Sequence, residues 1–185
     1  MHDSTQGLED LLAALDAYSR AYPAEATQAA QFAAFARSGA DVAERTRLDG
    51  HLTASCWLVS ADGERALLTH HRKLQRWLQL GGHADGDLDL ARAALREALE
   101  ESGLSDLAVD DTIFDLDAHP IPARGAEPEH THWDVRYVVR CEGSEDYAVS
   151  EESLDLAWLP IASLATDAAL DPSIRRMAAK WLARC

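Results

Sequence analysis

The stretch from Gly82 to Leu104 indicates the fold of this chain, and it reads GHADGDLDLARAALREALEESGL. A glycine turn opens the stretch, and a helix is predicted from about Asp89 to Ser102. Gly103 closes this helix, because glycine adopts the positive φ of a helix C-terminus without a steric cost.

Three glutamates share one face of the predicted helix. Glu97, Glu100 and Glu101 are three and four residues apart, so their side chains project from the same side. Like charges in this arrangement repel and cost helix stability, and a divalent cation would remove that cost. Oxygen donors at this density suit a hard cation, Mg²⁺ or Mn²⁺. Taken alone, however, the three are more simply read as solvated carboxylates.

The stretch resembles the Nudix box, Gly-x5-Glu-x7-Arg-Glu-U-x-Glu-Glu-x-Gly-U, in which U is apolar. The matching positions are Gly82, Arg96, Glu97, Ala98, Glu100, Glu101, Gly103 and Leu104. Because this match is long and fixed in spacing, the chain is identified as a member of the Nudix superfamily. One position departs, since Leu88 stands where the family has its first glutamate. That glutamate is not a usual metal ligand, so its loss bears on the order of the loop more than on the chemistry.

The resemblance implies an α/β/α sandwich with a mixed sheet for residues 48–185, preceded by a helical extension at residues 1–47. It implies attack of water on a diphosphate bond in a nucleoside diphosphate linked to another moiety, which is hydrolysis of an acid anhydride. Mg²⁺ or Mn²⁺ would be held by Glu97, Glu100 and Glu101. Glu97 or Glu101 would also share the role of general base, and Arg96 would hold a box carboxylate in place.

Further site residues are expected outside the box helix. Nudix proteins often carry another catalytic or metal-binding carboxylate before the last strand, and Glu152 is the candidate, with Glu151 next to it. A solvated loop acid is the simpler interpretation of either residue. Gly82 allows a close backbone turn, and His83 is a candidate substrate contact. Arg72 and Lys73 are candidate phosphate contacts, with an ordinary solvated loop as the alternative.

The strand predicted from His130 has one polar and one apolar face. The polar face carries His130, His132, Asp134 and Arg136, and the apolar face carries Trp133, Val135, Tyr137 and Val139. The polar face is expected to line solvent or a cleft, with His132 and Arg136 as candidate substrate contacts. His-x-His-x-Asp could also indicate a zinc site. That reading is disfavoured because no cysteine lies nearby and one strand presents only alternate residues.

Composition limits the partners and the compartment. The chain has 185 residues, 47% of them hydrophobic, and a formal net charge of -15. This charge argues against a nucleic-acid polymer or an anionic membrane as the main partner, but not against a small phosphorylated substrate. Three widely spaced cysteines without a CxxC pair favour free thiols in the cytoplasm. No signal peptide or membrane-spanning run is apparent. The oligomeric state is open, and the helical extension is a candidate homodimer surface.

Outside the box, hydrophobic periodicity predicts the remaining elements. Helical spacing begins at Leu8, is interrupted by Pro23 and resumes from about residue 24 to 37, with Phe32 and Phe35 available for packing. Strands are predicted from His51, at about 65–70, at 113–118 and at 156–160, with a hairpin turn at Asp62-Gly63. A closing helix is predicted at about 172–183, with an apolar stripe of Ile174, Met177, Ala178, Trp181 and Leu182.

Two other functions are weighed against hydrolysis. A Nudix-fold module that binds a nucleotide without cleaving it would explain Leu88, but the retained Arg-Glu and Glu-Glu pairs oppose it. An isoprenoid-diphosphate isomerase on the same fold would need a cysteine in the cleft, whereas Cys56 is predicted inside a strand. The identity of the substrate is not encoded in any motif of this sequence.

Overall fold

The computed structural model describes residues 4–125, 127–150 and 153–184. Its strands pair in the order β3-β2-β1-β6-β5, with β4 on β1 and β7 on β2. A mixed sheet with flanking helices, including an N-terminal helix, confirms the predicted α/β class. The chain divides into two compact units. Unit 1 is Met1–Ala54, Gly82–Ala93 and Asp111–Tyr137, and unit 2 is Ser55–Gly81, Ala94–Asp110 and Val138–Cys185.

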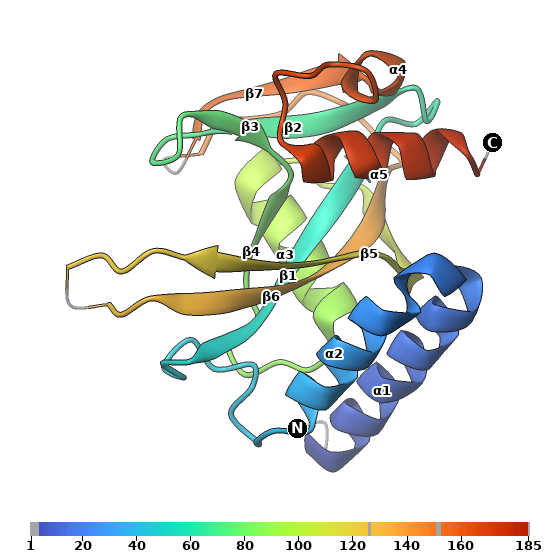
Figure 1. Ribbon diagram of the computed structural model, residues 1–185. Helices are drawn as coiled ribbons and strands as arrows, with labels where there is room; N and C mark the ends of the chain where they lie inside the picture. The colour runs from blue at the N-terminus through green and yellow to red at the C-terminus, as the bar shows by residue number, and fades with distance from the viewer. Residues whose placement is uncertain (1–3, 126, 151–152, 185) are drawn as a thin grey trace. The chain divides into compact units, whose positions relative to one another are not determined.

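The N-terminal part of unit 1 is helical, as predicted. It contains α1 (Ser4–Ala21), the short 3-10 helix η1 (Pro23–Glu25) and α2 (Ala26–Ala36). Helices α1 and α2 lie side by side (Figure 1). Pro23 starts η1, because proline cannot supply the backbone N–H that a continuous helix would need. Leu11 and Leu15 are buried, as their helical spacing predicts.

Within unit 1, helix α2 packs on strand residues. These come from β5 (Leu107–Ile121) and β6 (His130–Cys141), which continue into unit 2. The ring of Trp133 stacks on Phe35, with centroids 4.7 Å apart, and meets Phe32 edge-on at 5.1 Å. Gln28 Nε2 donates to the Leu116 carbonyl at 3.1 Å. The predicted packing role of Phe32 and Phe35 is confirmed.

Unit 2 is built around strand β2 (Arg65–His71). This strand pairs antiparallel with β3 (Arg76–Leu78) and β7 (Ser153–Pro160). Strands β3 and β4 (Leu80–His83) were not predicted from the sequence. Strands of three or four residues are too short to show a hydrophobic period, so only their pairing partners define them. Trp77 lies in β3 and stacks on His70 with a centroid distance of 5.1 Å.

The C-terminal helices of unit 2 are α4 (Ile161–Leu164) and α5 (Pro172–Leu182). Asp171 caps α5 by accepting a hydrogen bond from the Ser173 N–H, as its Asp-Pro start predicts. Four residues of the predicted stripe are buried, namely Ile174, Met177, Ala178 and Trp181. Including Leu182 in the stripe was wrong, since it is 43% exposed at the last turn. Trp181 Nε1 donates to the Gly63 carbonyl at 2.9 Å and so ties α5 to the predicted hairpin.

Strand β1 (Gly50–Val59) is buried along its whole length. Both of its faces are therefore buried, whereas the sequence pattern required burial of only one. Cys56 lies in this strand with 0% exposure, and Cys141 is likewise a buried thiol. None of the helices among the described residues is long and apolar enough to cross a bilayer.

Candidate active site

Helix α3 (Leu90–Ser102) carries the predicted site, and two aspartates hold its start. Asp89 is the N-cap, because its Oδ1 accepts from the Arg92 N–H at 3.0 Å. Asp87 accepts from the Asp89 N–H at 2.9 Å and from the Arg92 guanidinium at 2.7 Å. These bonds order the loop that lacks the first box glutamate.

Leu88 itself meets the N-terminal helix α1, which belongs to the same unit. A Cβ placed on Gly7 of α1 would lie 3.1 Å from the Leu88 Cβ. Leu88 also lines a shallow pocket with Leu11, Leu90 and Tyr137. The departure from the box therefore replaces a loop carboxylate with an apolar contact to the helical extension.

The end of α3 depends on a glycine. Gly103 has a φ of +69°, in the left-handed region where a side chain is strained. A Cβ at this position would also lie 3.0 Å from the Ala148 Cβ. The predicted end of the helix is confirmed. Glu100 and Glu101 lie in the last turn, just before this end.

Two box glutamates have defined partners within unit 2. Arg96 Nη2 donates to Glu97 Oε1 at 2.8 Å, and the Glu97 side chain is only 16% exposed. Glu101 Oε2 accepts from the Gly81 backbone N–H at 3.1 Å. Both carboxylates are therefore held in defined orientations. Glu100 is exposed at the helix surface.

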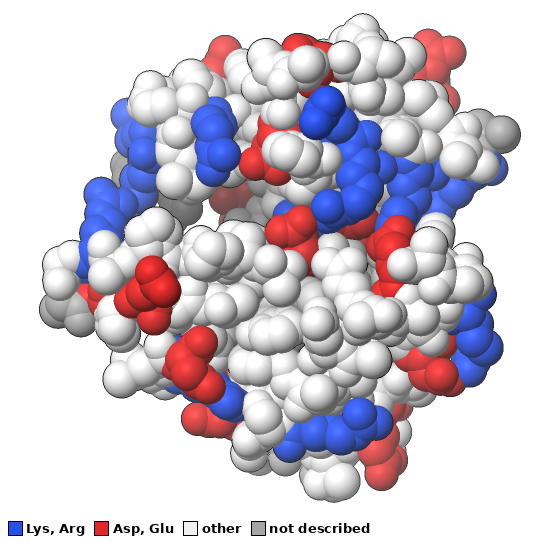
Figure 2. All heavy atoms as spheres, in the orientation of Figure 1, with Lys and Arg blue, Asp and Glu red and all other residues white. Residues whose placement is uncertain are grey.

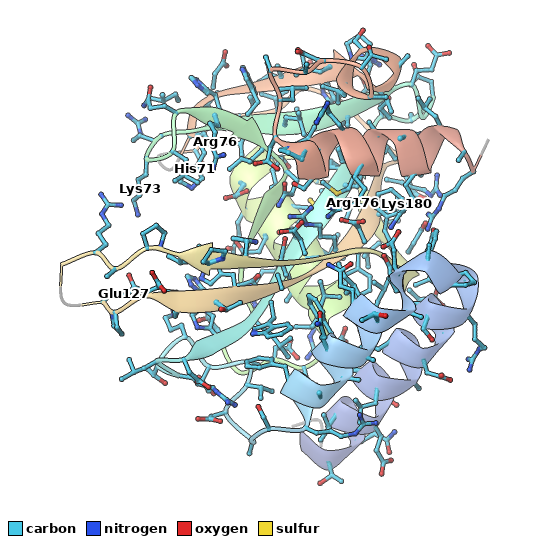
Figure 3. All side chains as sticks on the ribbon, in the orientation of Figure 1. His71, Lys73, Arg76, Glu127, Arg176 and Lys180 are labelled. Carbon is cyan, nitrogen blue, oxygen red and sulfur yellow. The ribbon has the colours of Figure 1, made fainter. Side chains whose placement is uncertain are left out.

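The predicted phosphate contacts lie at the turn between β2 and β3. Arg72 Nη2 donates to the Ser153 carbonyl at 2.8 Å, so one edge of its guanidinium already binds the backbone of β7. Lys73 is exposed and extends away from this hairpin (Figure 3).

Basic side chains are also gathered over α5, where Arg176 and Lys180 lie (Figures 2 and 3). Glu151 and Glu152 lie outside the described residues.

Most of the polar face of β6 is buried and paired, with His132 half-buried, whereas solvent or a cleft was expected. Arg136 is 2% exposed and donates to Asp134 at 2.7 Å and to Asp115 at 3.3 Å. Burial lowers the pKa of the Arg136 guanidinium, but Asp134, Asp117 and Asp115 outweigh it and leave that pKa raised. Thr53 Oγ1 donates to Asp134 at 3.0 Å. This arrangement supports a structural role for Arg136, and its role in substrate binding stays a prediction.

His83 and His132 lie close to His51, which was not predicted from the sequence as a site residue. His51, at the start of β1, lies between them, with ring centroids 5.1 Å from His83 and 4.8 Å from His132. Burial lowers the pKa of His132 to about 3, with His51 and His83 adding to the effect. His51 carried no local signal, because one histidine in an alternating strand is most simply a core position.

Among the described residues, the donor atoms that could share one ion are those of His51, His83 and His132. The box glutamates do not form such a group in the described structure. They offer carboxylate oxygens on one helix face, two of them oriented by Arg96 and Gly81. Oxygen donors are the ligands that Mg²⁺ and Mn²⁺ prefer, so the chemistry of this face fits a hard divalent cation.

Comparison with solved structures finds the same fold in several hydrolases. An Ap4A hydrolase from C. elegans, solved as a binary complex, has a TM-score of 0.57 at 18% identity and covers 72% of this chain and 96% of its own. The E. coli dihydroneopterin triphosphate pyrophosphohydrolase has a TM-score of 0.56 at 17% identity, with coverages of 72% and 96%. The MutT protein of Methanosarcina mazei Go1 has a TM-score of 0.53 at 16% identity, with coverages of 75% and 96%. At these identities the likeness concerns the fold.

Comparison with curated proteins finds no match. The family model described as the NUDIX domain matches residues 49–182, which is well over half of the chain. This match spans the complete box and the strands on either side of it. The chain therefore belongs to the Nudix family.

Proposed function

We propose that this protein is a metal-dependent hydrolase that cleaves a diphosphate bond in a nucleoside diphosphate linked to another moiety. The observation that carries the proposal is the glutamate face of α3. Glu97, Glu100 and Glu101 project from one side of the helix, and Arg96 and the Gly81 N–H hold two of the carboxylates in place. Family membership supports the same reaction class, hydrolysis of an acid anhydride.

Mg²⁺ or Mn²⁺ is the proposed cofactor, held by the three glutamates. When bound, it neutralises charge on the phosphate oxygens and lowers the pKa of a coordinated water. Arg96 keeps the Glu97 carboxylate oriented through its hydrogen bond. Gly81 does the same for Glu101 through its N–H. Glu101 or Glu97 accepts the proton of the attacking water, and Glu152 is a further proposed catalytic carboxylate.

The proposed substrate is a small nucleotide-type diphosphate. Lys73 and Arg72 supply positive charge for phosphate oxygens in an otherwise acidic chain. Gly82, His83 and His132 remain proposed substrate contacts. The structural neighbours include an Ap4A hydrolase and a dihydroneopterin triphosphate pyrophosphohydrolase, so both compound classes belong among the substrates to be assayed.

The test measures the release of phosphate and nucleoside monophosphate from a panel of dinucleoside polyphosphates, nucleoside triphosphates, sugar nucleotides and nicotinamide dinucleotides, with Mg²⁺ or Mn²⁺. Dihydroneopterin triphosphate is added to the panel, with pyrophosphate release as the readout. We expect metal-dependent turnover of at least one compound. Glu101→Gln should lower kcat by about 10²–10⁴-fold, the usual loss for a general acid or base, while ligand affinity is retained. Glu64→Gln, an exposed hairpin residue, is the matched control and should leave turnover unchanged.

The alternative of a nucleotide-binding module makes the opposite prediction. If no compound is turned over and one binds tightly, hydrolysis is excluded and the Leu88 loop becomes the feature to study. The isomerase alternative is opposed by Cys56, which has 0% exposure inside β1.

A further inference from the structure

We propose that His51, His83 and His132 form a second metal site, specific for Zn²⁺ and distinct from the glutamate face of α3. All three residues belong to unit 1, and they come from β1, β4 and β6. The proposal stands on this chain's own geometry and does not depend on the proposed hydrolysis.

The first support is the convergence of three imidazole nitrogens. One ring nitrogen of each histidine lies within 4.8 Å of the others. Tetrahedral Zn²⁺ with Zn–N bonds of about 2.0–2.1 Å places its nitrogen ligands about 3.3 Å apart. The cluster therefore needs a contraction of up to about 1.5 Å to bind such an ion.

The second support is His51, whose ring is buried with only a poorly aligned contact to the Arg47 backbone. His51 is 1% exposed, and neither Nδ1 nor Nε2 reaches a partner of normal hydrogen-bond geometry in the described structure. Buried polar atoms in folded proteins are almost always satisfied, because a lost hydrogen bond to water costs about 1–3 kcal/mol. A metal ion between His51, His83 and His132 would give one of the two His51 ring nitrogens a partner.

His130 orients one of the three ligands. Its Nδ1 lies 2.9 Å from the Pro128 carbonyl, an acceptor, so Nδ1 carries a proton. His130 Nε2 lies 3.2 Å from His132 Nε2, so a hydrogen bond between the two rings holds the His132 ring in place. Hydrogen bonding of the second ring nitrogen is the usual way in which a metal-binding histidine is oriented.

The donor set selects the ion. Three imidazoles without a carboxylate suit a borderline-soft transition metal and not Mg²⁺, which prefers oxygen. Among such ions Zn²⁺ accepts three histidines in a tetrahedral site. The fourth position is left for water or for an anionic oxygen of a ligand, so the proposed substrate contacts of His83 and His132 would act through the metal.

The test is calorimetric titration of the chelator-treated full chain with Zn²⁺ alone, in an excess of Mg²⁺. We expect one tight zinc ion per chain, and Co²⁺ in its place should give the visible absorption of tetrahedral coordination. His51→Phe removes one ligand and fills the same space with an apolar ring, so the metal-free variant should keep its Tm. His132→Gln is the second variant, at a half-buried position.

Each variant should weaken zinc binding by about 100-fold or more, above the range for loss of an outer-shell partner. His71→Gln, a half-exposed residue of β2, is the matched control and should bind zinc like the wild type. Glu101→Gln should also bind zinc normally, which separates this site from the proposed hydrolytic one. Absence of stoichiometric zinc in the wild type, or unchanged binding in both histidine variants, would overturn the proposal.

Discussion

Arg136 shows how one buried residue can hold several charges in place. Its side chain is 3% exposed and pairs with Asp134, also 3% exposed, and Asp115, which is fully buried. Removing the guanidinium would take away the positive charge that balances these buried carboxylates. Arg136→Met should therefore lower the free energy of unfolding by about 3–5 kcal/mol, measured by urea denaturation.

The matched control is Arg45→Met. Arg45 pairs with Asp85 at 2.7 Å, but both side chains are largely exposed, at 59% and 43%. An exposed pair contributes about 0–1 kcal/mol, because water screens it. Equal losses in the two variants would contradict the structural role assigned to Arg136.

At the scale of the element, α3 depends on the cap at its first turn. The Asp89 carboxylate accepts a hydrogen bond from the Arg92 N–H and lies at the helix N-terminus, where negative charge is favoured. Asp89→Ala should destabilise the protein by about 0.5–2 kcal/mol, seen as a lower urea midpoint at an unchanged m value. Asp89→Asn keeps the acceptor oxygen and should recover most of the loss. If alanine and asparagine behave alike, the side-chain cap contributes nothing.

Much of this element could be predicted from the chain itself. The spacing of Glu97, Glu100 and Glu101, together with Gly103, describes a helix whose start and end are local features. The short strands β3 and β4 could not be predicted, because their identity comes from partners in β2 and β1. The exposure of Leu182 at the end of α5 could not be predicted for a related reason. Nothing in the sequence shows that the buried face of the helix ends before this residue.

At the scale of the whole molecule, the net charge of -15 should make stability depend on salt. Excess negative charge repels itself in the folded state, and salt screens this repulsion over about 10 Å at 0.1 M. The Tm at neutral pH should therefore rise when NaCl is raised from about 0.01 M to about 0.1 M.

The control is the same measurement of Tm against NaCl at a lower pH. Near the pI of about 4.8 the net charge vanishes, so added NaCl should no longer raise the Tm. A Tm at neutral pH that falls with salt would mean that the surface ion pairs outweigh the overall repulsion.

The sequence by itself determined the family, the box helix, its caps and most strands, because these depend on residues close together in the chain. The glutamate face follows from helical geometry alone. The tertiary structure decided two further features, the burial of the Arg136 network and the gathering of His51, His83 and His132. Apart from Asp134 and Arg136, which are two residues apart on β6, their members come from different strands and meet only through strand pairing. Alternation along one strand shows which face a residue occupies, but it carries no information on what lies across from that face.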